Sequence, residues 1–251
     1  MANWQDPRTT SGTTGGINTA TVGVPHAARD AGLRSYMLSV YNYMASGVLL
    51  TGIIALLFAP YAGEVLLSSS GRGMSGLGWL IILSPLAIVF AMSFGMNRMR
   101  TSTLQILFWA FAALMGLSMS TLFLAYTGVS IAQTFFATAA AYVGLSLYGY
   151  TTKRDLSGFG TFLIMGVVGI LVAMLIKLFL QSSAMALAIS AIGVLLFAGL
   201  TAYDTQRIKS MYFQVAGSDM MGKVVIMGAL SLYLDFINMF QFLLAFMGDR
   251  R

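Results

Sequence analysis

Residues 191–204 read Ala-Ile-Gly-Val-Leu-Leu-Phe-Ala-Gly-Leu-Thr-Ala-Tyr-Asp, an uncharged apolar run that ends in a carboxylate. Residues 232–240 read Leu-Tyr-Leu-Asp-Phe-Ile-Asn-Met-Phe and enclose a second carboxylate among apolar neighbours. Burying an ionised carboxylate in hydrocarbon is costly, so an acid at membrane depth is a functional-site candidate by default. The chain has only eight acidic residues. Asp204 and Asp235 are therefore the first candidates.

The composition is that of a membrane protein. The 251 residues are 58% hydrophobic and only 9% charged, whereas soluble domains carry about 25% charged residues. The absence of cysteine excludes disulfides, thiol catalysis and thiolate metal sites. The one histidine, His26, lies in the polar start of the chain, so no histidine-based zinc or general-base site is expected. With no nucleophile–base pair or metalloprotease motif either, we expect no enzyme, no cofactor and no nucleic-acid partner.

Seven apolar runs predict seven transmembrane helices and an all-α membrane fold. Each run is long enough to cross about 30 Å of hydrocarbon at about 1.5 Å per residue. The runs do not alternate and are too long for barrel strands. Very short connections at 127–129 and 181–183 predict that the helices flanking each of them are antiparallel neighbours. The predicted spans are 37–59, 79–97, 104–126, 130–150, 159–181, 184–204 and 223–247.

Two domains follow from the charge and apolar patterns. Residues 1–30 are polar and of low complexity, so we expect a disordered cytoplasmic tail without a cleavable signal peptide, followed by a seven-helix transmembrane domain at 31–251. Lysines and arginines mark the cytoplasmic side of a membrane protein. They place the N-terminus in the cytoplasm and the C-terminus outside. The cytoplasmic group is Arg8, Arg29, Arg34, Arg98, Arg100, Lys153, Arg154, Arg207, Lys209 and Lys223; the opposite group is Arg72, Lys177, Arg250 and Arg251.

The last helix carries a polar seam. Ser231, Asp235, Asn238 and Gln241 are spaced by four, three and three residues, which places them on one helix face. Lipid would reject such a stripe, so we expect this helix to be the central, enclosed one. Asn238 and Gln241 are expected to form hydrogen bonds between helices rather than to bind a ligand.

Asp204 and Asp235 are expected at similar depth on sequential helices, although the sequence leaves their relative rotation open. At about 4 Å and an effective dielectric near 20, two such charges repel by about 4 kcal/mol. Both can stay ionised only if a cation joins them, so protons and a hard cation such as Ca²⁺ would compete for the pair. The alternative is structural, with each carboxylate accepting hydrogen bonds that fix helix register. We favour the functional interpretation because intramembrane acids usually lie on ion pathways.

Two motifs around these acids resemble the Bax inhibitor-1 (transmembrane Bax-inhibitor-motif) family, and its bacterial members in particular. They read Ala-Tyr-Asp-Thr-Gln-Arg-Ile-Lys at 202–209 and Gly-Ala-Leu-Ser-Leu-Tyr-Leu-Asp-Phe-Ile-Asn-Met-Phe at 228–240. Residues 111–118 and 133–135, Phe-Ala-Ala-Leu-Met-Gly-Leu-Ser and Gln-Thr-Phe, are also similar to the family pattern. The likeness extends over residues 30–251. The connection from Ser210 to Gly222 is expected to be longer than in compact members.

The resemblance implies a fold and a mechanism. The fold is seven helices with the last one central between two three-helix layers. The mechanism is a calcium leak gated by an aspartate pair that matches Asp204 and Asp235. A basic residue of the second helix pairs with the first aspartate in the closed state, and here Arg98 and Arg100 are both candidates. Members are also linked to suppression of cell death and to control of a membrane protease.

Three functions therefore compete. The first is a pH-sensitive, Ca²⁺-permeable leak channel in a bacterial cytoplasmic (inner) membrane, with Asp204 and Asp235 as gate, pH sensor and transient Ca²⁺ ligands. The second is a regulatory protein that binds and modulates a membrane protease or another partner through its N-terminal tail. The third, an ion-coupled transporter, would need inverted repeats and broken helices. The sequence has no clear internal repeat and no proline in its last two predicted helices.

Overall fold

The computed structural model describes residues 26–68, 73–180 and 182–251, which are helical apart from short connections and two isolated bridges. Hydroxyl caps begin several helices: Ser75 accepts a hydrogen bond from the Gly78 amide, and Thr127 accepts one from the Ser130 amide. The helices are α1 His26–Leu66, α2 Gly76–Gly95, α3 Thr101–Met119, α4 Leu122–Ala125, α5 Gly128–Thr151, α6 Ser157–Leu180, α7 Ser183–Val215 and α8 Met221–Met247.

Seven helical segments of the described chain are long and apolar enough to cross a membrane, with α3 and α4 counted as one segment. This confirms the predicted all-α membrane fold. The outer surface agrees with it, because large apolar side chains such as Phe94, Phe179 and Leu195 are 83%, 87% and 73% exposed. Such side chains would be unfavourable in water over this much surface, and they suit contact with lipid.

Two helices are longer than their apolar runs. α1 begins at His26, within the expected tail, and continues past Pro60, whereas residues 1–25 lie outside the described chain. α7 continues beyond Asp204 to Val215, and Gly217 with φ 77° turns the chain toward α8. The expected long connection from Ser210 to Gly222 is therefore wrong. α7 remains helical beyond its apolar run, to Val215, and its additional turns pack against other helices. The ring of Tyr212 lies 5.4 Å from that of Tyr36 on α1.

The expectation that α3 and α5 are antiparallel neighbours is also wrong. The hydroxyls of Ser120 and Thr121 donate to backbone carbonyls three residues earlier, 2.6 and 2.8 Å away, and α3 ends there. Such bonds compete with the helical ladder. The short helix α4 then contacts α1 and α5, whereas α3 and α5 do not pack along their lengths. The same prediction for α6 and α7 is confirmed, because these two helices pack together.

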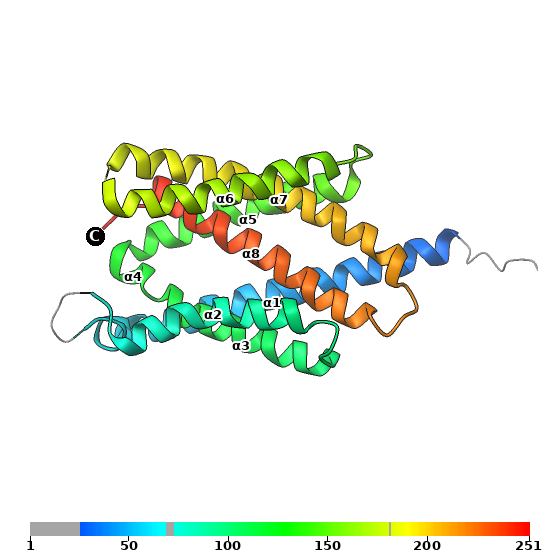
Figure 1. Cartoon of the computed structure of the whole chain (residues 1–251), viewed down its shortest axis with the longest axis horizontal. Coiled ribbons are helices and arrows are strands. Elements are labelled where there is room, and N and C mark those ends of the chain that lie inside the picture. The colour runs from blue at the N-terminus through cyan, green and yellow to red at the C-terminus, as the bar shows by residue number, and fades with distance from the viewer. Residues whose placement is uncertain (1–25, 69–72, 181) are drawn as a thin grey trace, which may run out of the picture.

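α8 is the most enclosed helix of the described chain. In its most apolar stretch 56% of residues are buried, against 39% in α7 and less in the other spans. It packs against α1, α3, α5 and α7. Figure 1 shows α8 crossing obliquely between a group formed by α1, α2 and α3 and a group formed by α5, α6 and α7. The central position predicted from the polar seam is thus found, and the strict division into two three-helix layers stays a prediction.

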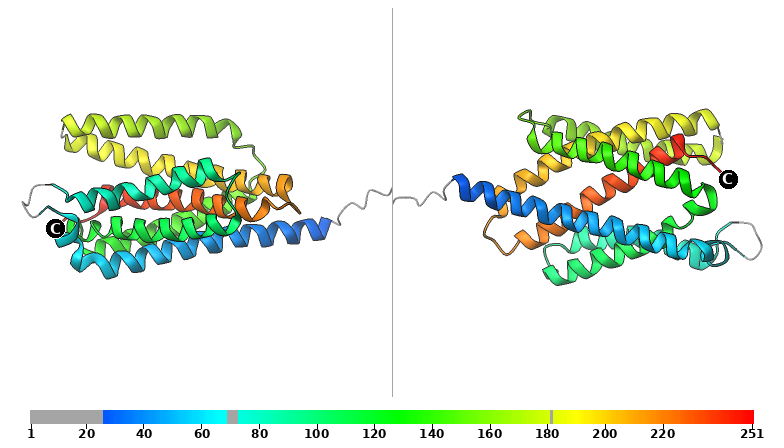
Figure 2. Two further views of the ribbon diagram at one scale, coloured as in Figure 1. Left: turned by 60° about the horizontal axis from the view of Figure 1, so that its bottom comes forward. Right: turned by 180° about the vertical axis from the view of Figure 1, so that it is seen from behind.

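The connections rich in lysine and arginine lie at one end of the bundle. Figures 1 and 2 show the start of α1 at the same end as the α2–α3, α5–α6 and α7–α8 connections. The α1–α2 and α6–α7 connections, α4 and the C-terminus lie at the other end. We call these the basic end and the C-terminal end. The charge pattern predicts this grouping for a membrane protein. Which end of the bundle faces the cytoplasm stays a prediction.

Candidate functional site

Asp235 and Asp204 come from the two helices that form the centre of the bundle. Asp235 lies midway along α8 and is 4% exposed, and Asp204 is half-buried on α7. α7 and α8 pack along each other, and Gly193 and Gly228 make room for Phe242 and Ile208 in that interface. The close packing follows from small residues in both helices, as is usual for helices in lipid.

The two carboxylates lie within electrostatic reach of each other, and their interaction is repulsive. Oδ2 of Asp235 is buried without a hydrogen-bond partner in the described chain. The cation whose charge acts on Asp204 is Arg207, one turn further along α7 and exposed. A buried carboxylate oxygen that no donor satisfies is unfavourable unless it holds a proton or a cation. The pair therefore has the properties of a site at which one of these binds.

Tyr142 on α5 completes this cluster, and the sequence analysis missed it. Its hydroxyl is buried without a hydrogen-bond partner and interacts electrostatically with Asp235, Asp204 and Tyr41. The missed signal is a stripe of polar residues at intervals of four along an otherwise apolar helix. That spacing places them on one inward face, and the described structure buries the stripe: Ser130, Thr134, Thr138, Tyr142 and Ser146.

A chain of hydroxyl groups joins three helices beside Asp204. The Tyr41 hydroxyl on α1 lies 2.6 Å from that of Ser146 on α5, and the Ser146 hydroxyl lies 3.1 Å from that of Thr205 on α7. Either member of each pair can donate. Hydroxyl chains of this kind can reorient to pass a proton or to solvate an ion, because each group is both donor and acceptor.

A close backbone approach holds α5 and α7 together at this level. A Cβ atom on Gly149 would lie 2.2 Å from the backbone oxygen of Ala202, so only glycine fits there. Further toward the basic end, Lys209 donates to the Tyr150 carbonyl at 2.7 Å, and Gln206 bonds to Arg154 and Leu156 of the α5–α6 connection. These contacts fix Asp204 relative to Tyr142.

The two predicted arginines lie elsewhere. Arg98 and Arg100 are exposed in the α2–α3 connection at the basic end, and Arg100 precedes the first residue of α3. In the described chain neither forms an ion pair with Asp204 or Asp235, and the charge acting on Asp204 is that of Arg207. A closed-state contact with Arg98 or Arg100 stays a prediction.

The polar seam of α8 is only partly enclosed. Ser231, Asn238 and Gln241 are half-buried, in contrast to Asp235. Asn238 donates to the Leu234 carbonyl of its own helix at 2.8 Å, so the interhelical hydrogen bond expected for it is replaced by a local one. Within the seam, Asp235 is buried and interacts electrostatically with Tyr142.

The two carboxylates and the neighbouring hydroxyls supply only a few of the oxygen ligands that a Ca²⁺ ion takes. The described residues hold no group of three or more acidic, histidine or cysteine side chains that could retain a metal. A Ca²⁺ ion is coordinated by about six to eight oxygen ligands. Two carboxylates and hydroxyl oxygens supply part of such a shell, and water must supply the rest.

Comparison with known proteins agrees with the motifs. The family model described as inhibitor of apoptosis-promoting Bax1 matches residues 33–251. The chain belongs to the Bax inhibitor family. Among its relatives, inner membrane protein YbhL of Escherichia coli K12 is 45% identical over 224 residues, which cover 88% of this chain and 94% of YbhL.

Other bacterial proteins match over a similar length. An uncharacterized protein of Rickettsia prowazekii is 48% identical over 223 residues, covering 88% of this chain and 92% of the relative. An uncharacterized membrane protein of Streptococcus pyogenes serotype M3 is 36% identical over 226 residues, covering 90% and 97%. The likeness thus spans all seven membrane segments and establishes the chain as a membrane protein of this family.

Proposed function

We propose that this protein is a pH-sensitive, Ca²⁺-permeable leak channel in which Asp204 and Asp235 form the gate and pH sensor. The observation that carries the proposal is the repulsive pair itself, with a buried Asp235 oxygen that no donor satisfies. Such a pair favours either a shared proton or a bound cation. The family resemblance supports the same role for these two positions.

The pH dependence follows from this competition. At higher pH the pair has lost its shared proton, so its negative charge attracts Ca²⁺ and the ion passes. At lower pH a proton occupies the pair, the attraction weakens and the leak closes. The other titratable or charged side chains that act on the pair are Tyr142 from α5 and Arg207 from α7.

The test is Ca²⁺ flux through the purified protein in liposomes at several pH values. We expect Asp204→Asn and Asp235→Asn, alone and together, to lower the high-pH flux about tenfold, the effect of about 1.4 kcal/mol, and to flatten its pH dependence. Asp219→Asn is the matched control, because Asp219 is exposed in the α7–α8 connection. Unchanged pH-dependent flux in the double variant would refute the proposal.

We also propose a cytoplasmic (inner) membrane location with the basic end in the cytoplasm. YbhL is described as an inner membrane protein, and lysine and arginine cluster at one end of the bundle. Because the chain has no cysteine, Ser218→Cys and Asp249→Cys are clean probes. An impermeant maleimide should label position 249 from outside intact cells and position 218 only after lysis. The reverse pattern would overturn this orientation.

The alternative role, a regulator that binds a membrane protease, depends on the N-terminal tail. Residues 1–25 lie outside the described chain, so no described contact favours it. Deleting residues 1–25 separates the two roles. A channel keeps its Ca²⁺ flux after the deletion, whereas a tail-docked regulator loses capture of its protease.

A further inference from the structure

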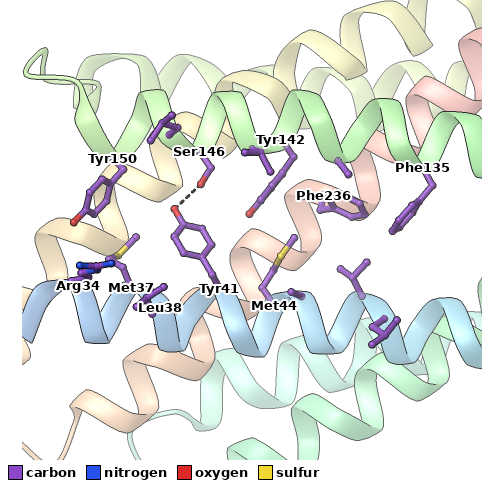
Figure 3. Close-up of a pocket in the computed structure, with 16 residues that line it drawn as sticks. Arg34, Met37, Leu38, Tyr41, Met44, Phe135, Tyr142, Ser146, Tyr150 and Phe236 are labelled. Atoms are coloured by element: carbon purple, nitrogen blue, oxygen red, sulfur yellow. Dashed lines mark hydrogen bonds between the residues drawn. The ribbon is translucent and has the colours of Figure 1, made fainter.

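A long cleft separates α1 from α5. A cavity of about 800 Å³ lies between the two helices, with Phe236 of α8 contributing to its lining. Figure 3 shows side chains of α1 and α5 facing each other across it, and the Tyr41–Ser146 hydrogen bond crosses from one helix to the other. Its walls are almost entirely apolar, since methionine, leucine, valine, alanine and phenylalanine dominate the lining.

The cleft continues toward the C-terminal end of the bundle. A second cavity of about 320 Å³ shares Val48, Leu49 and Phe135 with the first and extends to Leu56. We call the two cavities together the α1–α5 groove. From Arg34 to Leu56 α1 rises about 33 Å, close to the thickness of the hydrocarbon core of a bilayer. The groove is therefore long enough for a whole acyl chain with its headgroup at one end.

The groove opens sideways onto the lipid-facing surface. Leu49, Val143 and Leu147 on its two rims are 65%, 65% and 60% exposed. Their exposure means that a molecule lying between them would come from the lipid phase. Apart from the hydroxyls of Tyr41, Tyr142 and Ser146, the lining between the two ends offers water few polar partners and suits a hydrocarbon chain.

The basic end of the groove carries positive charge. Arg34 lines the cavity, is exposed and forms no ion pair in the described chain. Tyr150 lines the same end, and the ammonium of Lys209 lies 4.9 Å from the centre of its ring. Asp30, one turn before Arg34, shares a shallow hollow with it but forms no ion pair with it. Figure 3 shows Arg34 and Tyr150 at one end and Phe135 at the other.

We propose that the α1–α5 groove binds one anionic phospholipid, with an acyl chain along Val48 and Phe135 and the phosphate at Arg34. An apolar slot with a free guanidinium at one end matches the amphipathic shape and the charge of such a lipid, because guanidinium binds phosphate through paired N–H donors. The bound chain covers the side of the bundle where Tyr142 lies. The groove shares Tyr41, Tyr142 and Ser146 with the cluster beside the aspartate pair, but lipid binding there does not require the protein to conduct Ca²⁺.

The test uses the whole protein in mild detergent and counts bound lipid by native mass spectrometry. Phosphatidylglycerol and phosphatidylcholine with identical acyl chains are offered separately. We expect one tightly bound phosphatidylglycerol per chain, and we expect Arg34→Gln to weaken it about tenfold, while phosphatidylcholine binding changes little. Ala45→Trp, which fills the groove from an exposed lining position, should remove both lipids.

Two substitutions serve as matched controls. Arg154→Gln removes an exposed charge in the α5–α6 connection, and Ala87→Trp adds bulk to the exposed surface of α2. Both should retain the bound lipid. Equal retention of the two lipids by the natural chain and the Arg34→Gln variant would overturn the headgroup assignment. Two results would overturn the lipid site itself. The first is lipid binding that survives Ala45→Trp in a folded, monodisperse protein. The second is a dimer, formed without lipid, that this substitution disrupts.

Discussion

The phenol of Tyr142 on α5 and the carboxylate of Asp235 on α8 are both buried and interact electrostatically, and neither Tyr142 Oη nor Asp235 Oδ2 has a hydrogen-bond partner in the described chain. Buried polar groups are nearly always satisfied, so two unsatisfied groups that interact mark a place where something else binds or where a proton moves. The ring of Tyr142 packs 5.5 Å from that of Phe236, which fixes its position. Ring packing positions Tyr142, and the two oxygens are the groups that the proposed mechanism assigns to an ion or a proton.

Substituting Tyr142 by phenylalanine tests this role. Because the hydroxyl has no hydrogen-bond partner, its loss should leave the free energy of unfolding unchanged or slightly higher. In contrast, Ca²⁺ flux at high pH should fall, since the phenol is one of the few oxygens near the pair. Thermal unfolding and liposome flux, measured on the same preparation, separate the two effects.

Tyr233→Phe is the matched control. The Tyr233 hydroxyl is 2.7 Å from that of Thr51 on α1, so its removal should cost about 0.5–1.5 kcal/mol of stability. The pH dependence of flux should be retained, because this hydroxyl belongs to the contact of α8 with α1. A flux loss in Tyr233→Phe equal to that in Tyr142→Phe would contradict the assignment.

Gly149→Ala should disturb the α5–α7 contact. The added Cβ would meet the Ala202 backbone oxygen at 2.2 Å, and the backbone cannot swing aside as a flexible side chain can. The helices must separate, at a cost of about 1–3 kcal/mol for overpacking. Thermal unfolding in detergent measures the cost, and the flux assay measures whether the pair of carboxylates is displaced.

Gly144→Ala provides the comparison on the same helix. No atom lies within 4 Å of a Cβ built at Gly144, so the substitution should leave stability unchanged or raise it by up to about 1 kcal/mol through helix propensity. Equal stability of the two alanine variants would show that the close approach at Gly149 contributes nothing to the fold.

Asp155, at the surface, makes a pH-dependent contribution to the stability of the fold. In the α5–α6 connection, hydrogen bonds from the hydroxyl and the backbone N–H of Ser157 hold the pKa of Asp155 below its ordinary value. A carboxylate with a lowered folded pKa stabilises the fold above its unfolded pKa, and this contribution is lost as pH falls through the folded value. Ser157→Ala should raise the pKa of Asp155 partway, since the backbone N–H still donates. Carbon-13 NMR titration of the carboxyl measures it, and an unmoved pKa would contradict the stated cause.

Much of this fold is readable from the sequence. Apolar runs of membrane length predict the seven spans, and the stripe through Asp235 predicts that α8 is central. Both follow from one physical rule, because hydrocarbon accepts apolar surface and rejects polar side chains. The same rule identifies Asp204 and Asp235 as the residues to examine.

The remaining features depend on contacts that hydropathy does not encode. Beyond the apolar run, α7 continues because its side chains pack, as the contact of Tyr212 with Tyr36 shows. The route from α3 to α5 is set by hydroxyl–carbonyl bonds at Ser120 and Thr121. Tyr142 was missed because a tyrosine in a membrane helix is usually interfacial, and only its place in a stripe of buried hydroxyls indicates otherwise.

In the proposed mechanism, protons and Ca²⁺ compete for one buried carboxylate pair. Difference infrared spectroscopy of the protein in lipid membranes observes that competition directly, through the carbonyl band of a protonated carboxyl group. If protons and Ca²⁺ compete, such a band is present near neutral pH, is lost when Ca²⁺ is added, and is absent from the Asp204→Asn, Asp235→Asn double variant. A band that Ca²⁺ leaves unchanged, or that persists in the double variant, would contradict this mechanism.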